Sequence, residues 1–126
     1  MGRVERFEDL IAWQNARVLT KAIYEFTRKQ PFAKDFGLCG QTQRAAASIM
    51  SNIAEGFERG GRTEFHQFLV IAKGFCAEVR SLLYVERDVG YIISEDFVKV
   101  NELALEVGRI IGGILASVQK QKETIK

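Results

Sequence analysis

The sequence has few of the residues that metal and catalytic sites need. Its 126 residues include one histidine, His66, and two cysteines, Cys39 and Cys76. A di-iron site in a helical bundle needs paired Glu-x-x-His motifs, and the residue three positions before His66 is Thr63. On one helix Cys76 and His66 would point about 80° apart, with about 15 Å of rise between them. Because no phosphate-binding glycine loop is present either, we predict no metal, no cofactor, no catalytic residue and no enzymatic activity.

Long apolar runs and export signals are also missing. No apolar run approaches the roughly 18 residues of a membrane span, and the opening MGRVERFEDL lacks the apolar core of a secretory signal. The two cysteines lie in different segments, which does not indicate a disulfide framework. We therefore expect a cytoplasmic protein with reduced thiols and no membrane partner.

The excess of positive charge is small. Lysine and arginine number 18, against 16 aspartates and glutamates, which gives a net charge of +2. A nucleic-acid surface would therefore need basic residues gathered on one edge or repeated in an oligomer. Hydrophobic residues make up 47% of the chain, which is enough to build the core of one folded domain.

Breaks in the apolar periodicity divide the chain into four helical segments, about 9–30, 38–59, 63–89 and 94–120. Asp9 is the expected N-cap of the first helix, and Pro31 follows its end; Gly60, Gly90 and Ser94 mark later boundaries. Apolar residues recur in each segment at steps of three and four, which is typical of packed helices. Residues 1–126 are therefore predicted to form a single all-α domain, an antiparallel up-down-up-down four-helix bundle.

The same spacing predicts which residues form the core. The first helix offers a seam of Ala12, Ala16, Leu19, Ile23 and Phe26. The third helix offers Phe65, Leu69, Ala72, Cys76, Val79 and Leu83. The seam expected on the fourth helix is Val100, Leu103, Val107, Ile110 and Ile114.

The fourth helix also carries a row of small side chains, formed by Ala104, Gly108, Gly112 and Ala116. Each glycine inside a helix costs about 1 kcal/mol relative to alanine. We therefore expect a neighbouring helix to approach closely along this row and to offset that cost.

Two rows of cations follow helical spacing away from the expected core. The first helix carries Arg17, Lys21 and Arg28 on one face, and the third carries Lys73, Arg80 and Arg87 seven residues apart. Such rows are commonly a solvated surface, and nearby acidic residues partly neutralise them. The alternative is that these six residues bind nucleic-acid phosphates, in a salt-sensitive way that does not depend on sequence.

A row of polar residues lies on one side of the second helix: Arg44, Ser48, Asn52, Glu55 and Arg59. In one interpretation Asn52 and Glu55 are partly buried, bond to neighbouring helices and fix their register. In the other, the row is a recognition surface for a partner.

The third and fourth helices carry more apolar surface than one bundle needs. Their apolar arcs are wide, and an exposed arc would favour aggregation. A closed homo-oligomer is the simplest way to cover this surface.

The segment SIMSNIAEGFERGGRTEFHQFLVIAKG resembles the four-helix bundle proteins encoded in intervening sequences of bacterial 23S rRNA genes. The stretches FEDLIAWQNA, PFAKDFGLCGQTQRAAAS and GYI extend this resemblance over nearly the whole chain. Two positions differ from the family pattern: Met50 stands where proline is usual, and Phe75 where serine is usual. We expect Met50 to leave the second helix straighter than proline would, and Phe75 to alter the packing after Gly74.

The resemblance implies a ring-shaped homopentamer with no established enzymatic activity. The accessory protein of diversity-generating retroelements is similar in fold and binds nucleic acid and a reverse transcriptase. The residues that make those contacts are not part of the shared SNIAEG signature, so the resemblance assigns no binding residue here. We predict a non-catalytic oligomer that associates with RNA or DNA, or acts as a scaffold, through repeated basic edges. The alternative is a protein-interaction module, such as a partner of a reverse transcriptase, without direct nucleic-acid binding.

Overall fold

The computed structural model describes the backbone of residues 3–125 and the side chains of residues 3–117. Four long helices account for most of this part of the chain, which contains no strand: α1 (Ile11–Thr27), α2 (Phe36–Glu58), α3 (Arg62–Asp88) and α4 (Ser94–Ile125). Two short 3₁₀ turns, η1 (Phe7–Asp9) and η2 (Phe32–Lys34), precede α1 and α2. The predicted all-α four-helix fold is confirmed.

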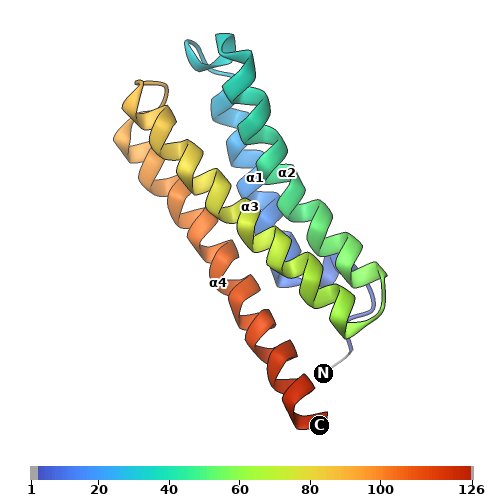
Figure 1. The fold of residues 1–126 in the computed structure, drawn as a ribbon. Helices are drawn as coiled ribbons and strands as arrows, with labels where there is room; N and C mark the ends of the chain where they lie inside the picture. The colour runs from blue at the N-terminus through green and yellow to red at the C-terminus, as the bar shows by residue number, and fades with distance from the viewer. Residues whose placement is uncertain (1–2, 126) are drawn as a thin grey trace.

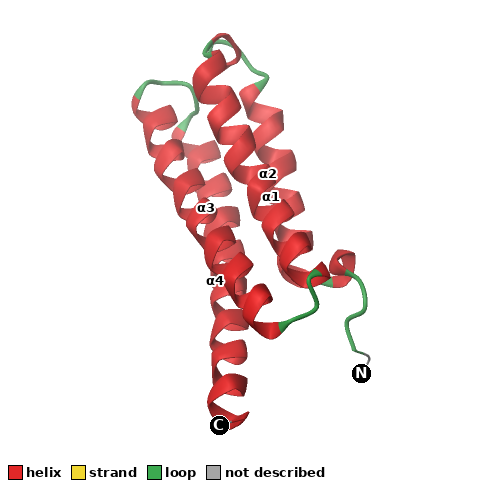
Figure 2. Ribbon diagram, turned by 45° about the vertical axis from the view of Figure 1, so that its right-hand side comes forward, coloured by secondary structure: helices red, strands yellow, loops and turns green. Residues whose placement is uncertain are grey.

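The four helices are joined end to end by short connections, so that consecutive helices run in opposite directions (Figure 1). α2 packs against α1 and α3, and α4 packs against α3 and α1. α1 and α3 therefore occupy diagonal corners of the bundle. The C-terminal part of α4 extends beyond the ends of the other helices (Figure 2).

The first two helices begin at residues other than those predicted. Asp9 is not the N-cap of α1, because its amide bonds to the Arg6 carbonyl oxygen (3.1 Å) and closes the η1 turn. α1 starts two residues later, after Leu10, and no side chain caps it. α2 begins at Phe36, two residues before the predicted start, and Asp35 caps it by accepting a hydrogen bond from the Leu38 amide (3.1 Å). An aspartate three residues before that amide is the usual capping arrangement.

The other helix ends differ for local reasons. α1 ends at Thr27, before Pro31 is reached, and α4 continues to Ile125 rather than ending near residue 120. Gly60 and Gly90 adopt positive φ angles of 79° and 83° after α2 and α3. Glycine takes this conformation without a steric penalty, which explains why both helices end within two residues of these positions.

The buried residues confirm the predicted seams of α1 and α3 and correct the predicted seam of α4. The seam of α1 is fully buried, and in α3 every predicted seam residue is buried except Phe65, which is half-buried. On α4 only Val100 and Val107 of the predicted seam are buried; Ala104 and Ile111 complete the row. Residues 100, 104, 107 and 111 also follow a four-three-four spacing, so the sequence allowed two neighbouring seams. The larger side chains Leu103, Ile110 and Ile114 pack beside the core.

Candidate functional site

The basic edge of α1 faces away from the core. Arg17, Lys21 and Arg28 are all exposed, and within the described residues none of them has a carboxylate oxygen within 4 Å. The Arg28 Nε donates a hydrogen bond to the Tyr24 carbonyl oxygen (3.1 Å). The Arg17 guanidinium carbon lies 5.7 Å from the ring centroid of Trp13. These cations are therefore accessible and unpaired in the described part of the chain.

A shallow hollow of about 660 Å³ adjoins this edge, where η1 meets the start of α1. Arg17 and Lys21 line it together with Arg6, Trp13 and Val18. The half-buried Trp13 packs edge-on against Phe7, with 5.2 Å between ring centroids. We expected Tyr24, not Trp13, among these cations, although Trp13 precedes Arg17 by one helical turn.

Two contacts of Glu8 shape this hollow. The Gln14 side-chain amide donates to the Glu8 carbonyl oxygen (2.9 Å), which ties η1 to α1. The Glu8 carboxylate pairs with Arg6 at 3.3 Å. A backbone hydrogen bond and the nearby Arg6 lower the pKa of Glu8, so this carboxylate stays charged at neutral pH. Because Glu8 pairs with Arg6, the charges of Arg17 and Lys21 remain uncompensated.

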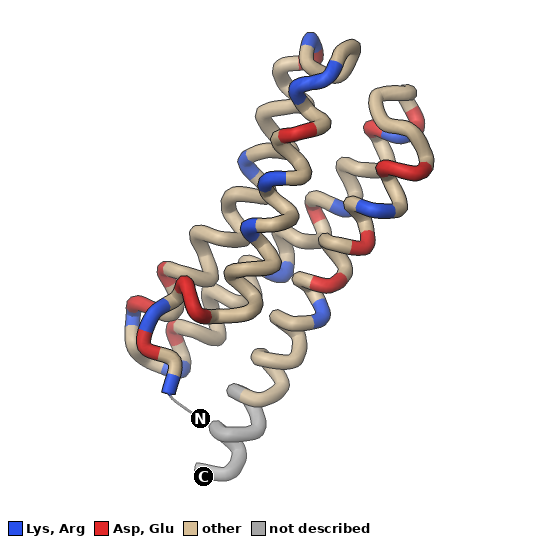
Figure 3. Tube along the Cα trace, turned by 180° about the vertical axis from the view of Figure 1, so that it is seen from behind, with Lys and Arg blue, Asp and Glu red and all other residues tan. Residues whose placement is uncertain are grey.

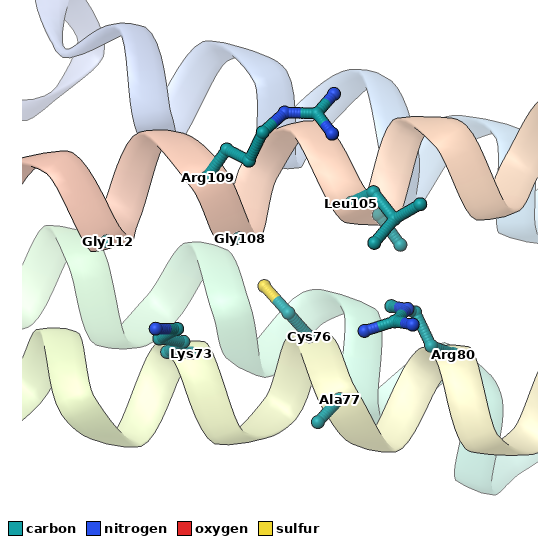
Figure 4. A pocket seen from close by; sticks show the side chains of 9 residues that line it. Lys73, Cys76, Ala77, Arg80, Leu105, Gly108, Arg109 and Gly112 are labelled. Atoms are coloured by element: carbon teal, nitrogen blue, oxygen red, sulfur yellow. The ribbon is translucent and has the colours of Figure 1, made fainter.

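The basic residues of α3 are distributed differently. Lys73 and Arg80 line a groove of about 360 Å³ between α3 and α4, together with Cys76, Gly108 and Gly112 (Figure 4). The Arg80 Nε is buried and has no hydrogen-bond partner within the described residues.

Arg87, the third cation of this row, packs at the end of the bundle instead. Its guanidinium carbon lies 4.5 Å from the Phe97 ring centroid and 5.1 Å from that of Tyr84, and it pairs with Asp88 at 3.7 Å. The two basic edges lie on diagonal helices, so they form no continuous surface within one subunit. Charges of both signs are mixed along the helices (Figure 3).

The row of small residues on α4 does not bring the helices into close contact, so our prediction was wrong. A Cβ atom added at Gly108 would meet no heavy atom within 4 Å, and at Gly112 it would meet only the Lys73 amine at 3.7 Å. The missing side chains instead leave the groove open. Figure 4 shows the Cys76 sulfur pointing toward α4 and the Arg109 side chain pointing away from the groove. Burial raises the pKa of Cys76 to about 12, so this thiol is not a ready nucleophile.

The polar row of α2 bonds mainly within its own helix. The Asn52 amide donates to the Ser48 carbonyl oxygen (2.7 Å), and Glu55 pairs with Arg59 at 3.2 Å. The interpretation that Asn52 and Glu55 bond to neighbouring helices and fix register is therefore wrong. Arg59 does reach α3, where its guanidinium carbon lies 5.3 Å from the Phe68 ring centroid. Arg44 is exposed.

The buried polar contact between helices lies elsewhere and was missed. Glu86 of α3 is fully buried, and its Oε2 lies 2.6 Å from the Thr42 hydroxyl of α2. Burial raises the pKa of Glu86 to about 7, against the opposing effect of the Thr42 hydrogen bond. The Thr42 hydroxyl also lies 2.8 Å from the Leu38 carbonyl oxygen. The Thr42 hydroxyl is the donor to the Glu86 Oε2, and its single hydrogen is shared between that oxygen and the Leu38 carbonyl oxygen.

The sequence did contain a signal for Glu86. It lies three residues after Leu83, at the next position of the four-three seam on α3. The predicted seam included only apolar residues and therefore ended at Leu83. A charged residue at the next seam position indicates a buried carboxyl group that needs a partner.

The described residues hold no cluster of three or more histidine, cysteine, aspartate or glutamate side chains suited to a metal ion. None of the helices, as far as they are described, is long and apolar enough to cross a membrane. Residues 3–117 thus form a bundle with two separate basic edges, a hollow beside Trp13, an open groove between α3 and α4, and the buried carboxyl group of Glu86.

The comparison with protein families identifies this bundle. Residues 8–113 match the family model described as 23S rRNA-intervening sequence protein. The chain belongs to this family. The match runs from η1 into the second half of α4, which confirms the resemblance inferred from the SNIAEG segment and its neighbours.

A solved structure supports the fold. It is a protein of unknown function from the S23 ribosomal protein family of Bacteroides thetaiotaomicron, with a TM-score of 0.76 at 23% identity. The alignment covers 83% of this chain and 98% of that protein. Among curated proteins, none matches the chain. At this identity the similarity establishes the shared bundle and carries no assignment of binding residues.

Proposed function

We propose that this family member is a non-catalytic, cytoplasmic, self-associating bundle that binds the phosphates of nucleic acid through the basic edge of α1. The observation that supports this most directly is the cluster of Arg17 and Lys21 around the hollow beside Trp13. Exposed cations without acidic partners attract phosphates at little desolvation cost. An aromatic ring among them offers a surface on which an unpaired base can stack, worth about 1–3 kcal/mol per base.

The edge of α1 suits this role better than the basic residues of α3. Lys73 and Arg80 line a groove between two helices, and Arg87 packs on two aromatic rings. Three cations on one subunit with a net charge of +2 would bind weakly. Repetition of the α1 edge in an oligomer would supply the missing affinity through multivalency.

Binding to labelled RNA hairpins and duplex DNA, measured by fluorescence anisotropy at about 50 mM and about 200 mM salt, tests the proposal. We expect binding that weakens steeply with salt, and an affinity about tenfold lower for the double variant Arg17→Glu, Lys21→Glu. The control is Lys34→Glu, Lys99→Glu, which changes the net charge equally at two exposed lysines away from the hollow. The proposal fails if the chain does not bind at low salt, or if both double variants lose equal affinity.

A second candidate function is a protein-interaction module that binds no nucleic acid. It is favoured by the exposed part of the α2 polar row, where Arg44, Glu55 and Arg59 are accessible. Capture of one protein partner from nuclease-treated extract, lost on Arg44→Glu and kept by Arg17→Glu, Lys21→Glu, would support this candidate over the first.

A further inference from the structure

The basic edge of α1 reaches a second hollow, at the end of the bundle opposite to η1 (Figure 1). This hollow has a volume of about 530 Å³, and Arg28 and Phe36 line it together with Gln43. The Phe36 side chain is 83% exposed, more than any other large hydrophobic side chain in the described residues. Packing within the subunit therefore does not explain the phenylalanine at this position.

The first turn of α2 fixes the place of Phe36. Asp35, directly before it, accepts hydrogen bonds from the Leu38 amide (3.1 Å) on Oδ1 and from the Tyr91 hydroxyl (3.0 Å) on Oδ2. Both oxygens of this carboxylate are thus used within the subunit, and Phe36 begins α2 on an anchored backbone. A ring that is already held in place binds a ligand with little loss of conformational entropy.

Aromatic rings and cations alternate along α1 between the two hollows. The residues concerned, which we call the mixed row, are Trp13, Arg17, Lys21, Tyr24 and Arg28. At about 100° per residue they share an arc of about 80° on the helix, and they span about 22 Å. Tyr24, between the last two cations, is 37% exposed. The mixed row thus connects the hollow beside Trp13 with the hollow beside Phe36.

Few carboxylates lie near the mixed row. Residues 10–34 contain one acidic residue, Glu25, which lines a different hollow between α1 and α4. Residues 36–54 of α2 contain none. At the η1 end, Glu8 pairs with Arg6 at 3.3 Å. Positive charge therefore continues along the whole row, and such a row attracts phosphates.

Alternating rings and cations suit a single strand better than a duplex. Grooves that bind single strands combine cations, which follow the phosphates, with aromatic rings on which successive bases stack. In a duplex each base is already stacked between its neighbours, so only the phosphates would contact the row. An acidic peptide would likewise use the cations and leave Trp13 and Phe36 without flat partners.

We propose that the mixed row and Phe36 bind one unpaired strand of RNA or DNA. Its phosphates lie on the three cations of the row, and its bases stack on Trp13 at one end and on Phe36 at the other. A length of about 22 Å has room for about four nucleotides, the lower end of the range for single-strand grooves. This inference rests on the proposed function and adds the form of the nucleic acid and a second stacking residue.

Fluorescence anisotropy of the full chain with labelled oligo(dT) and oligo(U) of about 12 nucleotides, and with a DNA duplex of equal length, tests the inference. We expect both single strands to bind about tenfold more tightly than the duplex. Phe36→Leu keeps an apolar side chain but removes the ring, so it should weaken single-strand binding about tenfold and leave duplex binding unchanged. Phe36→Tyr should bind as the natural chain does.

The matched control is Ile93→Ala, which truncates another exposed apolar side chain, in the α3–α4 connection, and should change neither affinity. Circular dichroism checks that the variants stay folded. Equal binding of single strands and duplex, or full single-strand affinity in Phe36→Leu, overturns the inference and leaves phosphate binding by Arg17 and Lys21 standing. The absence of binding to any of these nucleic acids overturns both.

The other end of the row has its own signal, because Trp13 is the single tryptophan of the chain. A base stacked on it should quench its fluorescence when oligo(dT) is added, and the duplex should not. Polyglutamate of similar length carries comparable charge without bases, so it should leave the fluorescence unchanged. Quenching by polyglutamate as strong as that by oligo(dT) would assign the row to an acidic peptide and overturn the inference.

Discussion

α1 and α3 bury the same kind of seam but present opposite outward faces. Each helix places small and branched apolar residues at steps of three and four against the core. Outside, α1 shows Arg17, Lys21 and Arg28, whereas α3 shows a row of exposed uncharged residues that includes Val70, Gly74 and Ser81. The difference favours α1 over this face of α3 as the surface for a charged ligand.

The largest expected effect separates the core seam of α1 from the exposed face of α3. Leu19→Ala on α1 removes a fully buried side chain and should lower the free energy of unfolding by about 2–5 kcal/mol. Val70→Ala truncates a half-exposed side chain and should change it by less than about 0.5 kcal/mol. Urea denaturation at low protein concentration measures both. Similar losses at the two positions would mean that Val70 is packed within the single bundle, contrary to the comparison.

The next effect is the pH dependence of stability, in which the two seams differ. The seam of α3 ends with the ionisable Glu86, whereas that of α1 ends with the neutral Thr27. The pKa of Glu86 is raised from 4.5 to about 7 by burial. Below pH 4.5 the carboxyl group is protonated in both states, and its full contribution to stability is present. As pH rises toward 7 the unfolded chain releases this proton first, so stability falls, by an amount on the order of 3 kcal/mol.

The variant Glu86→Gln isolates the contribution of this carboxyl group to the pH dependence of stability. Its free energy of unfolding, measured in urea between pH 4.5 and pH 8, should lack the decline that the natural chain shows. Asp35, Cys39 and Tyr91 also lie at this end of the bundle and are unchanged in the variant. Parallel pH profiles for the two chains would mean that Glu86 ionises with an ordinary pKa in the folded state.

Periodicity was enough to predict the four helices and the seams of α1 and α3, because burial of an apolar stripe determines both. It was not enough for α4, where residues 100, 104, 107 and 111 compete with an equally regular neighbouring row. The open groove at Gly108 could not be predicted either, since a glycine row fits close packing and an empty space equally well. That choice depends on how α3 and α4 are placed by the rest of the core.

The candidate site was predictable only in part. The spacing of Arg17, Lys21 and Arg28 predicts that they share a face, and the structure places all three on the exposed side of α1. Trp13 lies four residues before Arg17 on α1, so helical spacing places the two side by side. The position of Phe7 against Trp13 depends on how η1 folds back, which sequence periodicity does not encode. For Asn52 and Glu55, a bond within the helix and a bond between helices have the same sequence pattern, and only the structure distinguishes them.

The smallest expected effect uses glycines to sharpen the comparison between the exposed face of α3 and the groove that α3 forms with α4. Gly74 and Gly108 lie inside helices, and an added Cβ meets nothing within 4 Å at either position. Alanine at each should therefore raise the free energy of unfolding by up to about 1 kcal/mol through helix propensity. Gly56→Ala is the matched opposite, because its Cβ would lie 2.6 Å from the Phe68 Cβ, and it should destabilise the bundle.

Thermal unfolding of the three variants measures these effects. A loss of stability in Gly74→Ala or Gly108→Ala would mean that the added methyl group meets a neighbour, contrary to the open space beside both glycines.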